Sequence, residues 1–144
     1  MENHESQEIK RKKQSLKRYR KNVACIVRLE RKRDLLDMRI KSIKSPNLSG
    51  MPRGGKPVTL DDLIADKTDL EDRIKRLKKK GHILKREILA EIDSLEEAKY
   101  CSVLESFFID CLSIEEIAEN EGYSDRYIYK LYEKGISLLT VKGQ

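Results

Sequence analysis

The sequence has few of the residues that metal centres, disulfides and catalytic sites require. Only two histidines and three cysteines occur in 144 residues, and the cysteines (Cys25, Cys101 and Cys111) form no CxxC pair. An odd number of separated cysteines favours small buried thiols in a reducing compartment over disulfides or metal ligands. No Ser/His/Asp, Cys/His or paired-carboxylate arrangement suggests catalysis. We therefore expect neither an enzyme nor a bound cofactor or metal.

Apolar residues are also scarce. The hydrophobic fraction is 38% and the charged fraction is 39%. No run approaches the roughly 18 apolar residues of a membrane-spanning helix, and the basic N-terminal region lacks the apolar stretch of a signal peptide. With only three prolines and seven glycines, the composition is typical of long helices and coiled coil. We expect a cytoplasmic, all-α protein that makes no membrane contact.

Positive charge is concentrated near the N-terminus. Residues 1–45 contain 15 Lys and Arg against 6 Asp and Glu, whereas residues 97–144 contain 5 against 9. Such a basic arm suits a nucleic-acid backbone, because lysine and arginine release the cations condensed on phosphates. The alternative is a solvated coiled-coil face. On the first interpretation, the phosphate contacts of the basic arm are Lys10, Arg11, Lys12, Lys13, Lys17, Arg18, Arg20 and Lys21.

Two long helices are predicted in the N-terminal two thirds of the chain. Apolar residues recur at three- and four-residue steps over 5–44 and 59–93, which is the spacing of one helical stripe. The second stripe is a heptad seam that Lys67, Gly81 and Glu91 interrupt. Its apolar members are Leu60, Leu63, Leu70, Ile74, Leu77, Leu84, Ile88 and Leu95. We expect the two helices to form an antiparallel hairpin or coiled coil, or to pair with a second chain as a homodimer.

A loop rich in glycine and proline separates these helices at residues 46–58. Residues 50–56 match G-x-x-x-x-G-K, the start of a phosphate-binding loop. Pro57 stands where that motif needs Ser or Thr, and both flanks are predicted helix rather than strand. We interpret the match as chance and expect the basic loop to touch DNA or a partner. Thr59 follows it as a suitable N-cap.

Residues 94–144 are predicted to form a small separate domain, which leaves 1–93 as the coiled-coil region. S-x-x-E occurs at 94–97 and again at 113–116, and this spacing is that of a capping box at a helix start. Gly122 allows a left-handed turn, and Ser124 caps a last helix. Helix, short helix, glycine-containing turn and helix is the helix-turn-helix arrangement.

The C-terminal stretch resembles region four of bacterial sigma factors. The matching residues are 112–118 (LSIEEIA), 122–124 (GYS) and 128–131 (IYKL). With its basic helical N-terminal half, its MPRG-containing loop and its middle helix, the whole chain resembles phage-encoded regulators of the RinA/ArpU type, most strongly over 94–139. This resemblance implies a sequence-specific, DNA-binding transcriptional regulator, and typically an activator of late or packaging genes in a phage or prophage.

A recognition helix enters the major groove of double-stranded DNA by its N-terminal end. Arg126 could bind guanine there, and the tyrosines could meet thymine methyl groups or phosphates. The matching sigma helix is usually rich in Arg and Gln, unlike this one. The alternative is a solvated surface with aromatic packing at a dimer interface. The DNA-binding residues predicted here are Ser124, Asp125, Arg126, Tyr127, Tyr129, Lys130 and Lys134.

Other functions also fit the sequence. The acidic face of the two helices before the last one could meet a basic partner such as host RNA polymerase. A small terminase subunit, which packages viral DNA as a large ring, also combines helix-turn-helix with coiled coil. A structural coiled-coil protein would not bind DNA. We favour the transcriptional regulator.

Overall fold

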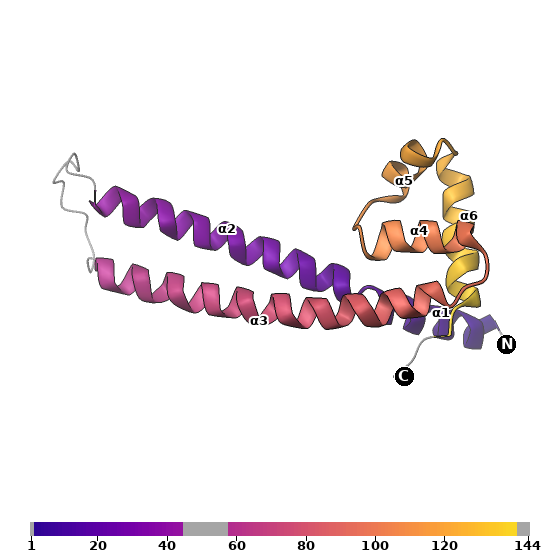
Figure 1. The fold of residues 1–144 in the computed structure, drawn as a ribbon, viewed down its shortest axis with the longest axis horizontal. Helices are drawn as coiled ribbons and strands as arrows, with labels where there is room; N and C mark the ends of the chain where they lie inside the picture. The colour runs from indigo at the N-terminus through magenta and orange to yellow at the C-terminus, as the bar shows by residue number, and fades with distance from the viewer. Residues whose placement is uncertain (1, 45–57, 141–144) are drawn as a thin grey trace. The chain divides into compact units, whose positions relative to one another are not determined.

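The computed structural model describes residues 2–44 and 58–140, with side chains from residue 7 onward. These residues form six α-helices and no strand (Figure 1). The helices are α1 (Glu2–Leu16), α2 (Arg18–Lys44), α3 (Leu60–Asp93), α4 (Ala98–Phe108), α5 (Ile114–Glu121) and α6 (Asp125–Leu138). The prediction of an all-α fold is confirmed. Apart from Val58, the predicted loop 46–58 lies outside the described residues, as does its G-x-x-x-x-G-K match.

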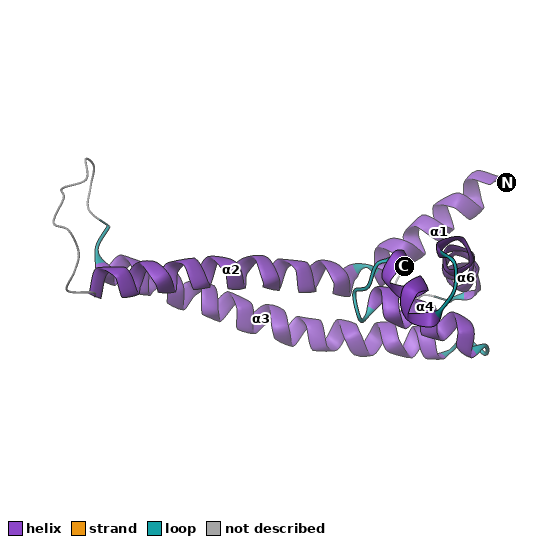
Figure 2. Cartoon of the chain, turned by 90° about the horizontal axis from the view of Figure 1, so that it is seen from above, coloured by secondary structure: helices purple, strands orange, loops and turns teal. Residues whose placement is uncertain are grey.

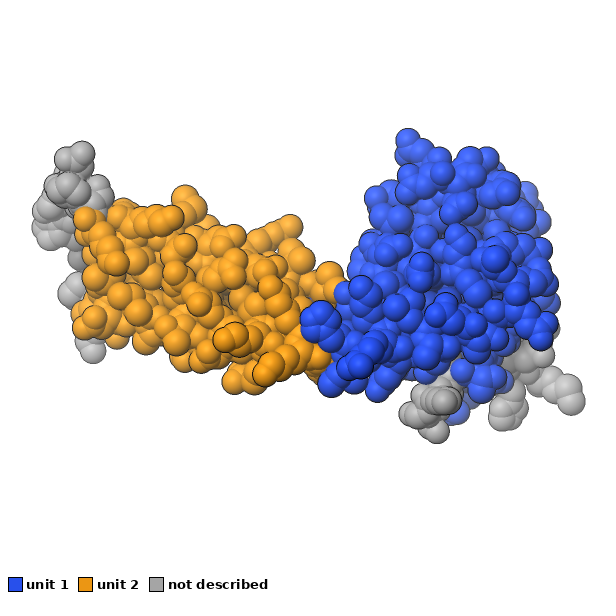
Figure 3. All heavy atoms as spheres, in the orientation of Figure 1, with its two compact units in different colours: residues 1–22, 81–144 blue, residues 23–80 orange. Residues whose placement is uncertain are grey.

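The chain divides into two compact units (Figure 3). Unit 1 comprises residues 1–22 and 81–144, and unit 2 comprises residues 23–80. This division differs from the predicted boundary between residues 93 and 94. The reason is that Leu16 of α1 and Ile88 and Ile92 of α3 are buried in the same apolar core as α4, α5 and α6. Both ends of the predicted coiled-coil region therefore fold with the C-terminal helices.

Unit 2 is built from α2 and α3, which run side by side within it (Figures 1 and 2). The apolar residues buried here are Leu29, Ile40, Leu63 and Ile74. Lys67 interrupts the apolar stripe of α3, and its ammonium lies 2.6 Å from the Asp37 carboxylate of α2. This hydrogen bond raises the pKa of Lys67 and lowers that of Asp37. Lys78 and Glu30 form a second ion pair across the two helices at 3.5 Å.

The predicted helix over 5–44 is broken at Lys17, which separates α1 from α2. At the break, Arg18 Nε donates a hydrogen bond to the Ser15 carbonyl oxygen at 2.7 Å. Leu16 is completely buried in the core of unit 1, and α1 packs against α6. A contact between the two ends of the chain thus redirects the first helix, and no local pattern signals it.

The capping box predicted at 94–97 is wrong. The amides of Ser94 and Leu95 still donate to carbonyls of the last turn of α3, and Ser94 Oγ donates to the Glu91 carbonyl oxygen at 2.6 Å. Glu97 occupies the N-cap of α4 without a side-chain capping bond. Ser94 therefore helps to end α3 and does not begin α4.

Helices α4 and α6 pack closely at Gly135. A Cβ atom built there would lie 3.1 Å from Leu104 Cδ1, so even an alanine would require the Leu104 side chain to shift. Beside this contact, the ring of Tyr132 lies 4.8 Å from Phe107 and 5.7 Å from Phe108, measured between ring centroids. Burial in this cluster raises the pKa of Tyr132 to about 12. The phenol is part of the core.

Candidate nucleic-acid interface

Helix α5 begins at the second predicted capping box, which is confirmed. The Glu116 amide donates to Ser113 Oγ at 3.1 Å, and the Ser113 amide donates to Glu116 Oε1 at 3.2 Å. The helix ends at Gly122, whose φ of 76° is the left-handed conformation that glycine adopts readily. The Gly122 amide donates to the Ala118 carbonyl oxygen. These bonds fix both ends of an eight-residue helix.

Helix α6 follows after three residues, 122–124. Ser124 caps it, because its hydroxyl accepts a hydrogen bond from the Tyr127 amide at 3.1 Å. Ile128 and Leu131 are buried against α4 and α5, as expected from their spacing. The seven residues predicted to bind DNA (Ser124, Asp125, Arg126, Tyr127, Tyr129, Lys130 and Lys134) are all exposed. The cap and the buried side thus leave the N-terminal half of α6 with an open polar face.

Arg126 and Lys130 lie one turn apart on this face, since residues four apart are neighbours on a helix. Two aromatic contacts flank them. The ring centroids of Tyr123 and Tyr127 are 4.8 Å apart, and those of Tyr129 and Tyr132 are 6.0 Å apart with the rings stacked. Tyr127 and Tyr129 therefore each have one ring contact within the chain while remaining exposed. Two cations and two exposed phenols share the surface.

Helix α1 packs against the C-terminal half of α6. Lys13 Nζ lies 2.7 Å from Glu133 Oε1 and 5.4 Å from the centroid of the Tyr132 ring. Lys12 Nζ donates to the Ser137 carbonyl oxygen at 3.2 Å. Consequently, α1 covers part of the C-terminal half of α6, whereas Arg126 and Lys130 in its first turns are exposed.

The eight residues of the basic arm have different environments. Lys12 and Lys13 contact α6, as described above, and Arg18 Nη1 lies 3.7 Å from Glu87 Oε2. The Arg20 guanidinium carbon lies 4.0 Å from the centroid of the Phe107 ring. Half of the predicted phosphate contacts thus also make contacts within unit 1. Of the remaining four, Lys10, Arg11 and Lys21 are exposed and Lys17 is half-buried.

A second basic surface lies on α3 and was not predicted. Residues 73–86 contain eight Lys and Arg and no Asp or Glu, and all eight are exposed. These residues, which we call the α3 basic segment, are Arg73, Lys75, Arg76, Lys78, Lys79, Lys80, Lys85 and Arg86. Residues 60–72 of the same helix contain six Asp and Glu and one Lys. When charges are summed over a long stretch of sequence, the opposite charges of these two blocks cancel. A sum over about four helical turns shows the two blocks separately.

The described residues contain neither a metal-binding cluster nor a membrane-spanning helix. Over 2–44 and 58–140, no three His, Cys, Asp or Glu side chains cluster so that they could hold a metal ion. No helix in the same ranges is long and apolar enough to cross a membrane. The three cysteines are free and half-buried, and burial raises the pKa of the Cys101 and Cys111 thiols.

Comparison with protein families identifies a match over most of the chain. Residues 42–140 fit the model of a family described as a protein of unknown function, DUF1492. The chain belongs to the DUF1492 family. No curated protein and no solved structure matches it. The DUF1492 match includes α3, α4, α5 and α6 in full, and hence both the exposed end of α6 and the α3 basic segment. Helix α1 and most of α2 precede the matched range.

Proposed function

We propose that this DUF1492 protein is a sequence-specific transcriptional regulator that reads double-stranded DNA with the first turns of α6. The observation that carries the proposal is the open polar face at the capped N-terminal end of α6. Major-groove readers present side chains at that end while the opposite side of the helix is held by the core. Arg126 would read a guanine, and Lys130 and the tyrosines would contact phosphates or thymine methyl groups.

The resemblance of residues 94–139 to region four of sigma factors, and of the chain to RinA/ArpU-type regulators, supports the same function. On that basis we propose activation of late genes in a phage or prophage, in the cytoplasm of the host. The acidic residues exposed on α4 and α5 would be available to a basic surface of host RNA polymerase. These residues are Glu105, Glu115, Glu116, Glu119 and Glu121.

The C-terminal part of the chain is acidic, so affinity for the DNA backbone must come from elsewhere. The exposed residues of the basic arm supply part of it. The α3 basic segment supplies more, because all of its cations are exposed. In this proposal α6 gives sequence preference, and the cations of α1 and α3 give affinity that does not depend on sequence.

The proposal is tested by enriching fragments of the source genome on the full chain and footprinting the bound site. Arg126→Ala should cost about 1–3 kcal/mol on that site, relax preference at one base pair and leave non-specific binding nearly unchanged. Arg31→Ala is the matched control, because Arg31 is an exposed arginine of α2 in unit 2. An intact footprint after Arg126, Tyr127 and Lys130 are all replaced by Ala would refute the assignment. Absence of any DNA binding would favour a structural coiled coil, and a large ring would favour a packaging subunit.

A further inference from the structure

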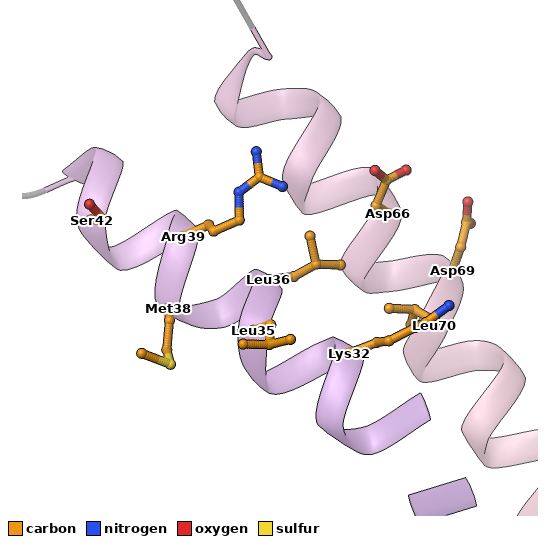
Figure 4. Close-up of a pocket in the computed structure, with 9 residues that line it drawn as sticks. All are labelled: Lys32, Leu35, Leu36, Met38, Arg39, Ser42, Asp66, Asp69 and Leu70. Atoms are coloured by element: carbon orange, nitrogen blue, oxygen red, sulfur yellow. The ribbon is translucent and has the colours of Figure 1, made fainter. Parts of the chain in front are cut away.

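Unit 2 contains an open groove of about 750 Å³ along α2 and α3 (Figure 4). Leu36 and Leu70 lie between the two helices, with Lys32 and Arg39 on the α2 side and Asp66 and Asp69 on the α3 side. The lining residues are Lys32, Leu35, Leu36, Met38, Arg39, Ser42, Asp66, Asp69 and Leu70. No part of the proposed DNA-reading helix lies in this unit, so the groove needs a separate explanation.

Two large apolar side chains of α2, Leu35 and Met38, border the groove on the side of Lys32 and Arg39 that is farther from α3. Leu35 is 62% exposed and Met38 is 66% exposed. They lie three residues apart on α2, away from the buried residues Leu29 and Ile40. Leu36 and Leu70 are half-buried, so apolar area is open to a partner both within and beside the groove, which is typical of an interaction surface.

The two sides of the groove carry opposite charges. Lys32 and Arg39 come from α2, and Asp66 and Asp69 come from α3 (Figure 4). None of the four side chains makes an ion pair or hydrogen bond with any residue in the described ranges. An anionic ligand would match only the α2 side, and a cationic ligand would match only the α3 side. The surface that satisfies both sides is one with the same two charges in the reverse order.

We propose that the occupant of the groove is the same groove of a second copy of the chain. A two-fold axis parallel to the helices would place α2 of one copy over α3 of the other. Lys32 and Arg39 of each copy would then face Asp66 and Asp69 of its partner, and Leu36 and Leu70 of the two copies would meet between these charges. In such an isologous contact each favourable pairing occurs twice. This inference goes beyond the proposed DNA-binding function and does not rest on it.

The first test is the mass of the full chain in solution, measured by light scattering without DNA. The wild type should show twice the chain mass of 16.8 kDa. The double variant Leu36→Gln/Leu70→Gln should show the mass of one chain, because the side chains that meet between the charged sides would no longer be apolar. Ile83→Gln is the matched control: Ile83 is 52% exposed on α3 but lies outside the groove, so this variant should stay dimeric. Unchanged far-UV circular dichroism would show that each variant is folded.

The second test examines the charged sides separately. Asp66→Lys/Asp69→Lys gives two cationic sides, and Lys32→Asp/Arg39→Asp gives two anionic sides. Each variant should dimerise roughly tenfold or more weakly at low salt, because like charges face one another. An equimolar mixture of the two should associate as a heterodimer, since every pairing is again of opposite sign. A wild-type chain that stays monomeric, a mass above two chains, or a dimer indifferent to both sets of substitutions would overturn the proposal.

Discussion

The ammonium of Lys13 lies 2.7 Å from the carboxylate of Glu133, which joins residues 120 positions apart in α1 and α6. Both side chains are partly buried. Lys13 therefore neutralises an acidic residue of the proposed reading helix and helps to hold α1 against the C-terminal half of α6. This is a role inside the fold, whereas the charge pattern alone assigned Lys13 to DNA phosphates.

We expect Lys13→Gln to lower the free energy of unfolding by about 1 kcal/mol, since the pair is only partly shielded from water. Glu133→Gln should cost a similar amount, and the double variant should cost little more than either, which a double-mutant cycle in urea would measure. The salt dependence of DNA binding should stay unchanged. Lys10→Gln is the control, because Lys10 is exposed on the same helix. If Lys13→Gln weakened DNA binding and left stability intact, Lys13 would be a phosphate contact after all.

Alkaline pH should destabilise unit 1 through Tyr132. Its folded pKa is about 12, above the ordinary value of 10.0. Between these values the unfolded chain loses the phenolic proton while the folded chain keeps it. The favourable contribution is therefore complete below pH 10 and is lost as pH rises towards 12, by about 1.4 kcal/mol per pH unit within that interval. Tyr132→Phe should show a shallower decline of unfolding free energy over the same range. Parallel curves for the two proteins would argue against a buried phenol.

The packing of α2 against α3 predicts which isoleucines of α3 contribute most to stability. Ile74 is 4% exposed, whereas Ile64 is 41% exposed on the same helix. Ile74→Ala should cost roughly 2–5 kcal/mol because it leaves a cavity. Ile64→Ala should cost no more than about 0.5 kcal/mol. Urea denaturation followed by circular dichroism measures both. Equal effects of the two substitutions would mean that the heptad stripe is not the buried side of this helix.

The features predicted correctly from sequence are local ones. The Ser113 capping box, the left-handed Gly122 and the Ser124 cap each depend on hydrogen bonds within four residues. The same S-x-x-E spacing misled the prediction at Ser94, because the end of α3 uses that hydroxyl. A short motif therefore predicts a cap only where no preceding helix competes for the serine.

What could not be predicted depends on long-range contacts. The break at Lys17 and the position of Lys12 beside Ser137 follow from the packing of α1 on α6. The heptad pattern located the stripe of α3 but did not explain its interruptions. At Gly81, a Cβ atom would lie 2.6 Å from Asn22 Oδ1, so the glycine permits a close approach of α2. The cause of such an interruption is the packing of α2 on α3. The sequence pattern of α3 alone does not show it.

The α3 basic segment should supply most of the sequence-independent affinity for DNA. Replacing Arg73, Lys75, Arg76 and Lys79 with Gln should weaken binding to all DNA alike. The slope of log affinity against log salt should fall by up to about 0.9 for each phosphate that the variant no longer neutralises. Lys78 is excluded from this set because it pairs with Glu30.

The control replaces four exposed cations of α2 (Arg28, Arg31, Lys41 and Lys44) with Gln, which gives the same change in net charge. If the α3 cations contact DNA phosphates directly, only the first variant lowers the slope. The control variant changes the net charge equally but removes no such contact. Equal reductions in both variants would mean that the overall field attracts DNA and that α3 makes no specific set of phosphate contacts.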